Sequence, residues 1–403
     1  MKPFLTCLAV LFCLSVNAQT NTYQTDLRAL RSIIEKTPSY KDQVKGDALI
    51  SYNTLYSRLE RDSTHPIFSF EYFENLAQLF FPIRDNHFGF YQIATPPSQE
   101  NFPQFKVNTD SLANQLAKKP IDSIEGIYYY DTCYSVGLFR TADKKYTGVV
   151  LQSNIPNWQR GQVAIHLYET EPGYYKAIYA HPKYKTLNLY SVEKFVNHSL
   201  VNSFFHNSFT SKVYSKHKGQ KDYVNIPDST PDFAFKDLDP QTQYLFIKHF
   251  SAMSNQMKRS DSFYLSIKNA ITAPNLIFDL RNNDGGALKV SRKFLNLLTE
   301  YAKTGNIFVL VNNGTMSQGE IFTLQLKQLA NVKVFGQTTR GTLVYGSNYG
   351  NRVQLPSGVF EVYPTDMGAD QRLVPYEVYG VKPDIILKND SDWIEQAMKY
   401  IVK

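Results

Sequence analysis

The carboxyl-terminal half of the chain alternates between short apolar runs and segments with helical spacing, and this alternation limits the possible folds most strongly. The apolar runs lie at 244–250, 276–280, 307–311 and 332–335. The segments with helical spacing between them reach about residue 270, cover 289–303 and extend to about residue 330. Strands separated by helices of this length pair in parallel, because each helix crosses over the sheet to the next strand. The pattern predicts an α/β domain with a mostly parallel sheet.

Two regions with different patterns precede this domain. Apolar residues recur at helical spacing from Tyr23 to about Phe81, which predicts an N-terminal helical subdomain within residues 19–100. From Ile121 to Tyr190, tyrosines alternate with polar residues and turns, as is typical of antiparallel strands. We therefore expect a Tyr-rich antiparallel β domain at 115–225 and the α/β domain at 232–403.

The first eighteen residues have the three parts of a secretory signal peptide. A single basic residue, Lys2, precedes an apolar stretch from Phe4 to Val16, and small residues end the segment before Gln19. This predicts a secreted or periplasmic protein whose mature chain begins near Gln19. Lipidation at Cys13 is disfavoured, because the large Phe12 precedes it. The apolar stretch is shorter than the roughly 20 residues of a membrane span, so we expect no stable membrane insertion.

Charge and cysteine content exclude several classes of protein. The net charge is +7, and no dense basic block stands out, so no nucleic-acid partner is expected. Cys133 is the only cysteine after the predicted signal peptide, which leaves no internal disulfide. The histidines lack metal-binding spacing and no phosphate-binding glycine loop occurs, so we expect neither a metal nor another cofactor.

Two turns of the α/β domain carry residues suited to catalysis. The first contains Gly285 and Gly286, whose backbone amides can approach a ligand and stabilise an oxyanion; a plain strand-to-helix turn is the alternative. The second contains Ser317 at a predicted helix start, where free amides and the local field suit a nucleophile. Ser317 and Glu320 also match a capping box, which is the structural alternative. All eight histidines precede this serine, and that order excludes an α/β-hydrolase.

A third turn contains Glu377 among apolar and aromatic residues. A carboxylate in such surroundings is costly to bury without a partner, and a histidine would be one.

Together these turns resemble peptidase family S41, the tail-specific or carboxy-terminal processing proteases and their tricorn-like relatives. The matching segments are FDLRNNDGG at 278–286, VLVNNGTMSQGEIF at 309–322, VFGQTTRG at 334–341 and GVKPDIIL at 380–387. The resemblance implies a crotonase- or ClpP-like α/β core with Ser317 as the nucleophile. It also implies an oxyanion hole built from the backbone amides of Gly285, Gly286 and Gln318.

The resemblance points to the tricorn-like branch. Processing proteases of the family use a Ser-Lys dyad, but Thr342 occupies the lysine position here, and Arg340 cannot release its proton. In the tricorn-like branch a D-x-H element supplies a histidine base and a glutamate orients it. His87 and Glu377 occupy these positions. The implied triad has Ser317 as nucleophile, His87 as general base, and Glu377 orienting the histidine.

Supporting roles fall to Asp85, Arg281 and Glu320, with Asp85 expected to brace the turn before His87. A histidine base with an ordinary pKa of about 6.5 would make activity rise through roughly pH 6 to 7.

The sequence therefore predicts an exported serine endopeptidase that cleaves peptides or unfolded proteins through an acyl-enzyme. One alternative is a non-catalytic protein of the same fold that binds peptides or small hydrophobic ligands. Another is a scaffold whose Tyr-rich domain binds envelope glycans or protein partners. The pattern of a PDZ domain is missing between Ile121 and Tyr190, where a small barrel or sandwich fits the strand spacing better. Because all three residues of the implied triad are present, hydrolysis is favoured over the two non-catalytic alternatives.

Overall fold

The computed structural model describes residues 22–62, 65–95, 102–219, 221–347 and 350–402. The predicted signal peptide and its cleavage site lie outside these residues. No helix in the described part of the chain combines the length and the apolar character needed to cross a membrane.

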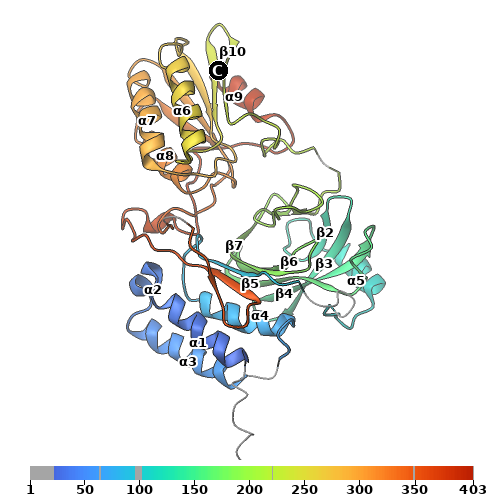
Figure 1. The fold of residues 1–403 in the computed structure, drawn as a ribbon. Helices are drawn as coiled ribbons and strands as arrows, with labels where there is room; N and C mark the ends of the chain where they lie inside the picture. Colours follow the sequence, from blue (N-terminus) through green and yellow to red (C-terminus); the bar gives the residue numbers. More distant parts are fainter. Residues whose placement is uncertain (1–21, 63–64, 96–101, 220, 348–349, 403) are drawn as a thin grey trace, which may run out of the picture.

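Four α-helices and a 3-10 turn form the N-terminal region, coloured blue in Figure 1. They are α1 (Thr22–Ile34), α2 (Pro38–Gln43), α3 (Asp47–Arg61), α4 (Phe70–Ala77) and η1 (Gln78–Phe80). Ser69 caps the start of α4, because its side chain accepts a hydrogen bond from the Tyr72 amide. The predicted helical spacing is seen in α1, where Leu27, Leu30 and Ile34 are fully buried.

An antiparallel sheet closes on itself in the middle of the chain. The short helix α5 (Thr109–Leu116) precedes its strands, which are β2 (Gly126–Tyr130), β3 (Tyr134–Ala142), β4 (Lys145–Ser153), β5 (Val163–Glu171), β6 (Tyr174–Ala180), β7 (Leu187–Val196), β8 (Ser199–Leu200) and β9 (Tyr214–Ser215). Consecutive strands pair from β2 to β7, β8 pairs with both β7 and β9, and β9 returns to β2. Every element between Gly126 and Ser215 is a strand, as predicted for this domain.

Three further strands extend this sheet beside β7. Strand β1 (Gly89–Gln92) pairs with β7 and with β16 (Phe360–Tyr363), and β16 pairs with β15 (Val353–Gln354). Residues 353–363 were expected in the carboxyl-terminal domain, but the structure places them on the middle sheet. The reason is a shared core in which Phe360 of β16 packs against Phe73 of α4 and Phe90 of β1, with ring centroids 5.9 Å apart in both pairs.

The carboxyl-terminal domain contains the predicted parallel sheet. Its strands, in spatial order, are β10 (Phe233–Asp239), β11 (Thr242–Ile247), β12 (Asn275–Asp279), β13 (Asn306–Val311), β14 (Val332–Gly336) and β17 (Ile385–Ile386). Only the β10–β11 pair is antiparallel. Helices α6 (Ser254–Ile267), α7 (Leu288–Tyr301) and α8 (Gln318–Leu326) cover one face, and α9 (Trp393–Ile401) covers the other (Figure 1). The α/β class with helical and antiparallel regions is therefore confirmed.

Candidate active site

Ser317 lies between β13 and α8, at the carboxyl edge of the parallel sheet. Its φ of 53° and ψ of −122° are rare for a residue with a side chain. Two hydrogen bonds hold this conformation. The Ser317 amide donates to the Thr342 carbonyl at 2.8 Å and to the Glu320 carboxylate at 3.1 Å. The surrounding structure therefore fixes a strained serine at the start of a helix.

Glu320 fastens the start of α8 to the segment that follows β14. Its buried carboxylate also accepts hydrogen bonds from the Thr339 hydroxyl at 2.5 Å and from the amides of Gly341 and Thr342 at 2.7 and 2.8 Å. The capping contact with Ser317 is thus one part of a larger buried network. Burial raises the pKa of Glu320, and these donors oppose that shift.

His87 lies opposite Ser317, although 230 residues separate them in the chain. The His87 Nε2 atom is 3.2 Å from Ser317 Oγ, which is hydrogen-bond distance. Asp85 holds the turn, since its carboxylate accepts from the His87 amide at 3.1 Å and from the Thr365 hydroxyl at 2.6 Å. The structure brings the predicted nucleophile and base together.

Glu377 makes no hydrogen bond to the His87 ring, unlike in the expected arrangement. One carboxylate oxygen accepts from the Asn86 amide at 2.7 Å, and the other accepts from the amides of Leu343 and Val344 at 3.1 and 2.9 Å. His87 Nδ1 is buried and has no hydrogen-bond partner among the described residues. The physical reason is that three backbone donors satisfy a buried carboxylate more completely than one imidazole N–H can. Glu377 therefore holds the neighbour of the histidine.

Asn86 is a site residue that the sequence reasoning missed. Besides the amide bond to Glu377, its side-chain Nδ2 donates to the Thr342 hydroxyl at 2.6 Å. The Thr342 carbonyl in turn accepts from Ser317. Asn86 thus links the turn of the base to the segment that holds the nucleophile. Its position beside His87 was the only sequence signal that pointed to it.

Burial shifts the pKa values of both His87 and Glu377. Burial, reinforced by the positive charge of Arg340, lowers the pKa of His87 to about 4. Burial and the nearby Asp85 raise the pKa of Glu377 to about 8. The imidazole is therefore neutral at neutral pH, as a general base must be, and the ordinary histidine value expected from the sequence does not apply.

The glycine pair after β12 packs directly against Ser317. A Cβ on Gly285 would lie 2.7 Å from Ser317 Cβ, and one on Gly286 would lie 2.2 Å from the Phe250 carbonyl oxygen. Both residues have positive φ values, 82° and 130°, so only glycine fits this turn.

The backbone amides in this region differ in availability. The Gly285 amide donates to the Asn283 side chain at 3.0 Å, so it is engaged inside the turn, contrary to the role expected for it. The backbone amides of Gly286 and Gln318 donate no hydrogen bond to any described residue. These two remain the candidates for an oxyanion hole.

Arg281 lies between the end of β12 and the same glycine turn. Its guanidinium forms a buried ion pair with Asp279, with a shortest N–O distance of 2.7 Å, and donates to the Tyr223 carbonyl at 3.1 Å. These contacts give Arg281 a structural role at the end of β12.

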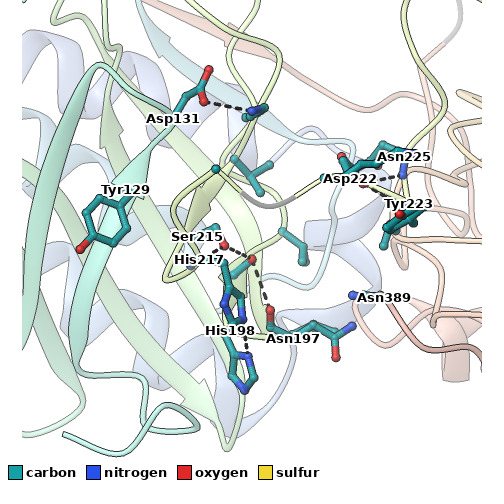
Figure 2. A pocket seen from close by; sticks show the side chains of 18 of the residues that line it. Tyr129, Asp131, Asn197, His198, Ser215, His217, Asp222, Tyr223, Asn225 and Asn389 are labelled. Carbon is teal, nitrogen blue, oxygen red and sulfur yellow. Dashed lines mark hydrogen bonds and ion pairs between the residues drawn. The ribbon is translucent and has the colours of Figure 1, made fainter. Parts of the chain in front are cut away.

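A separate cavity lies at the end of the closed sheet, where β8 and β9 approach the carboxyl-terminal domain (Figure 2). Its volume is about 310 Å³, and its lining includes Tyr129, His198, His217, Tyr223 and Asn389. None of the predicted site residues lines it. Within the described residues, no group of three or more His, Cys, Asp or Glu side chains could hold a metal ion.

Comparisons with solved structures gave several matches of low similarity. Mature CPAF is 12% identical, with 95% of this chain and 96% of that chain covered and a TM-score of 0.43. The tricorn protease is 13% identical, with 94% and 37% covered and a TM-score of 0.42. The photosystem II D1 C-terminal processing protease is 14% identical, with 92% and 94% covered and a TM-score of 0.36. All three TM-scores are below 0.5, so these likenesses assign no activity.

The sequence comparisons gave one family match. No curated protein matches the chain. Residues 291–387 match the family model of peptidase family S41, and this stretch includes Ser317, Glu320 and Glu377. In the part of the chain that carries the candidate nucleophile, the sequence therefore has the pattern of peptidase family S41.

Proposed function

We propose that the protein is a serine peptidase that cleaves peptide bonds through an acyl-enzyme at Ser317. The observation that carries the proposal is the 3.2 Å contact between His87 Nε2 and Ser317 Oγ. His87 precedes a strand of one sheet and Ser317 follows a strand of the other. A neutral, partly buried histidine within hydrogen-bond distance of a serine hydroxyl is the arrangement that activates this nucleophile. The family match over residues 291–387 supports the same reaction class.

In the proposed reaction, Ser317 Oγ attacks the peptide carbonyl carbon while His87 Nε2 accepts the hydroxyl proton. The amides of Gly286 and Gln318 stabilise the oxyanion that develops on the carbonyl oxygen. When the tetrahedral intermediate collapses, the imidazolium returns the proton to the leaving amine. A water molecule, deprotonated by His87, then hydrolyses the acyl-enzyme and regenerates Ser317.

Glu377 acts on this reaction through the backbone. Its bond to the Asn86 amide fixes the turn of the histidine, and its bonds to Leu343 and Val344 fix the segment after Thr342. We therefore assign Glu377 a positioning role. His87 carries its proton on Nδ1 when Nε2 faces the serine, and the structure gives this proton no acceptor among the described residues.

The unpartnered Nδ1 also supports a second candidate function. A histidine without an acidic partner is a weaker base, because nothing stabilises the imidazolium that forms during the reaction. A protein of this fold that binds peptides without cleaving them is therefore the competing proposal.

Hydrolysis of a broad peptide library separates the two proposals. The peptidase proposal predicts cleavage by wild-type protein and loss of cleavage in Ser317→Ala. Replacing an exposed serine, as in Ser262→Ala, is the matched control and should leave the rate unchanged. Saturable peptide binding with no cleavage by folded wild-type protein would support the binding function instead.

A further inference from the structure

Two lysines of the closed sheet are buried where this sheet meets the candidate active site. Lys176 lies on β6 and Lys194 on β7, and each is only 4% exposed. The two strands are neighbours, with Tyr174 opposite Lys194 in the register. Buried lysines are rare because the ammonium loses its hydration, so both positions require an explanation.

Lys194 holds the segment next to the nucleophile. Its Nζ atom donates to the carbonyl oxygens of Thr339 and Arg340 at 2.8 and 2.9 Å. Two residues further along, the Thr342 carbonyl accepts the hydrogen bond from Ser317. The ammonium therefore ties the backbone that positions the nucleophile to the closed sheet.

Lys176 holds the segment before the base. Its Nζ atom donates to the carbonyl oxygen of Ile83 at 2.9 Å and lies 3.5 Å from that of Phe80. On the other side of His87, the Ser191 hydroxyl of β7 donates to the Phe88 carbonyl at 3.1 Å. The sheet thus contacts the backbone on both sides of the histidine.

Ionisable groups of several elements face the two lysine side chains. Lys194 is near the carboxylates of Glu193 and Glu320 and near the Arg340 guanidinium. Lys176 is near Asp85 and Glu377. Burial lowers the pKa of both lysines to about 8, although these carboxylates oppose the shift.

We propose that Lys176 and Lys194 are positioning residues that fasten the turns of His87 and Ser317 to one rigid sheet and so set the distance between base and nucleophile. The functional part of this inference rests on the proposed peptidase activity. Neither lysine touches the reacting atoms. Their effect comes from donating hydrogen bonds to backbone carbonyls, which a neutral apolar side chain of similar size cannot do.

The first test compares Lys176→Met and Lys194→Met with Lys183→Met, an exposed lysine of the same domain. We expect kcat to fall by about 10²-fold in the first two variants, since a displacement of about 1 Å in a catalytic constellation has an effect of this size. KM should stay within about twofold, because the lysines do not bind substrate in this account. Lys183→Met should match wild type in both constants.

A second measurement does not depend on activity. Hydrogen–deuterium exchange should become faster at residues 339–342 in Lys194→Met and at 83–88 in Lys176→Met, while exchange in β12 and β13 stays as in wild type. If wild-type protein cleaves no peptide, the peptidase proposal fails, and the exchange rates still decide whether the lysines hold these turns.

The pH profile gives a signature that a purely structural contact would not produce. Activity of the wild type should fall above about pH 8, where both ammonium groups lose their protons. The double variant Lys176→Arg/Lys194→Arg should keep its activity to higher pH, because both guanidinium groups remain charged. Unchanged exchange at both turns, or kcat within about twofold of wild type in both methionine variants, would overturn the inference.

Discussion

At the scale of single residues, Ser317 and His87 form a pair in which each depends on the other. The serine hydroxyl is a weak nucleophile without a base, and the histidine has no other described side-chain partner. Ser317→Ala and His87→Ala should therefore each lower kcat by at least about 10³-fold, and the double variant should be little slower than either single variant. Steady-state kinetics on all three variants measures this. Additive losses would show that the two residues act independently.

The low pKa of His87 predicts the acid limb of the activity profile. Because the histidine must be neutral to accept a proton, activity should rise with pH through about 4 and be complete by neutral pH. Arg340 contributes to the low value, so Arg340→Met should move the limb to higher pH. Arg372→Met, at a side chain that is 89% exposed, is the control. An acid limb that stays in place in Arg340→Met would contradict this electrostatic link.

Glu377 makes a prediction about stability. Its pKa in the folded protein, about 8, lies above the ordinary glutamic acid value. Between these values the folded state binds more protons than the unfolded state, so the free energy of unfolding should decrease as pH rises toward 8. Glu377→Gln removes this contribution and should flatten the pH dependence in urea titrations. A slope equal to that of wild type would show that Glu377 keeps an ordinary pKa.

At the scale of elements, the carboxyl ends of β12 and β13 bring the glycine turn against the nucleophile. Gly286→Ala should lower both kcat and stability, since a Cβ would lie 2.2 Å from the Phe250 carbonyl oxygen. Gly173→Ala is a matched control, because Gly173 also has a positive φ of 83° but nothing within 4 Å of a Cβ. The control should lose only the cost of backbone strain, about 1 kcal/mol. Similar stability losses in both variants would contradict the close packing of the turn.

The sequence predicted the long, buried strands and helices of the parallel sheet, but not the short strands or the contacts made by the backbone. Strong periodicity located β11 to β14 and their helices, because each buries one continuous apolar face. Residues 353–363 were assigned to the carboxyl-terminal domain, because β1, the partner of β16 on the middle sheet, lies more than 250 residues earlier in the chain. The roles of Glu377 and Asn86 depend on backbone amides, which every residue carries, so no side-chain pattern could reveal them.

At the scale of the whole molecule, the candidate site is assembled from both sheets. His87 precedes β1, which extends the closed sheet beside β7, and Ser317 follows β13 of the parallel sheet. Neither part contains both residues. The contacts of Lys176 and Lys194 lie along the same boundary. We therefore expect activity to depend on how these two parts are held together.

The most direct test of this account is labelling of wild-type protein with a fluorophosphonate, followed by peptide mapping. A reactive serine should carry the label at Ser317 with one label per chain. His87→Ala should be labelled far more slowly while remaining folded, because the hydroxyl loses its base. No labelling of Ser317 in folded wild-type protein, or equal labelling in His87→Ala, would contradict the central claim that His87 activates Ser317.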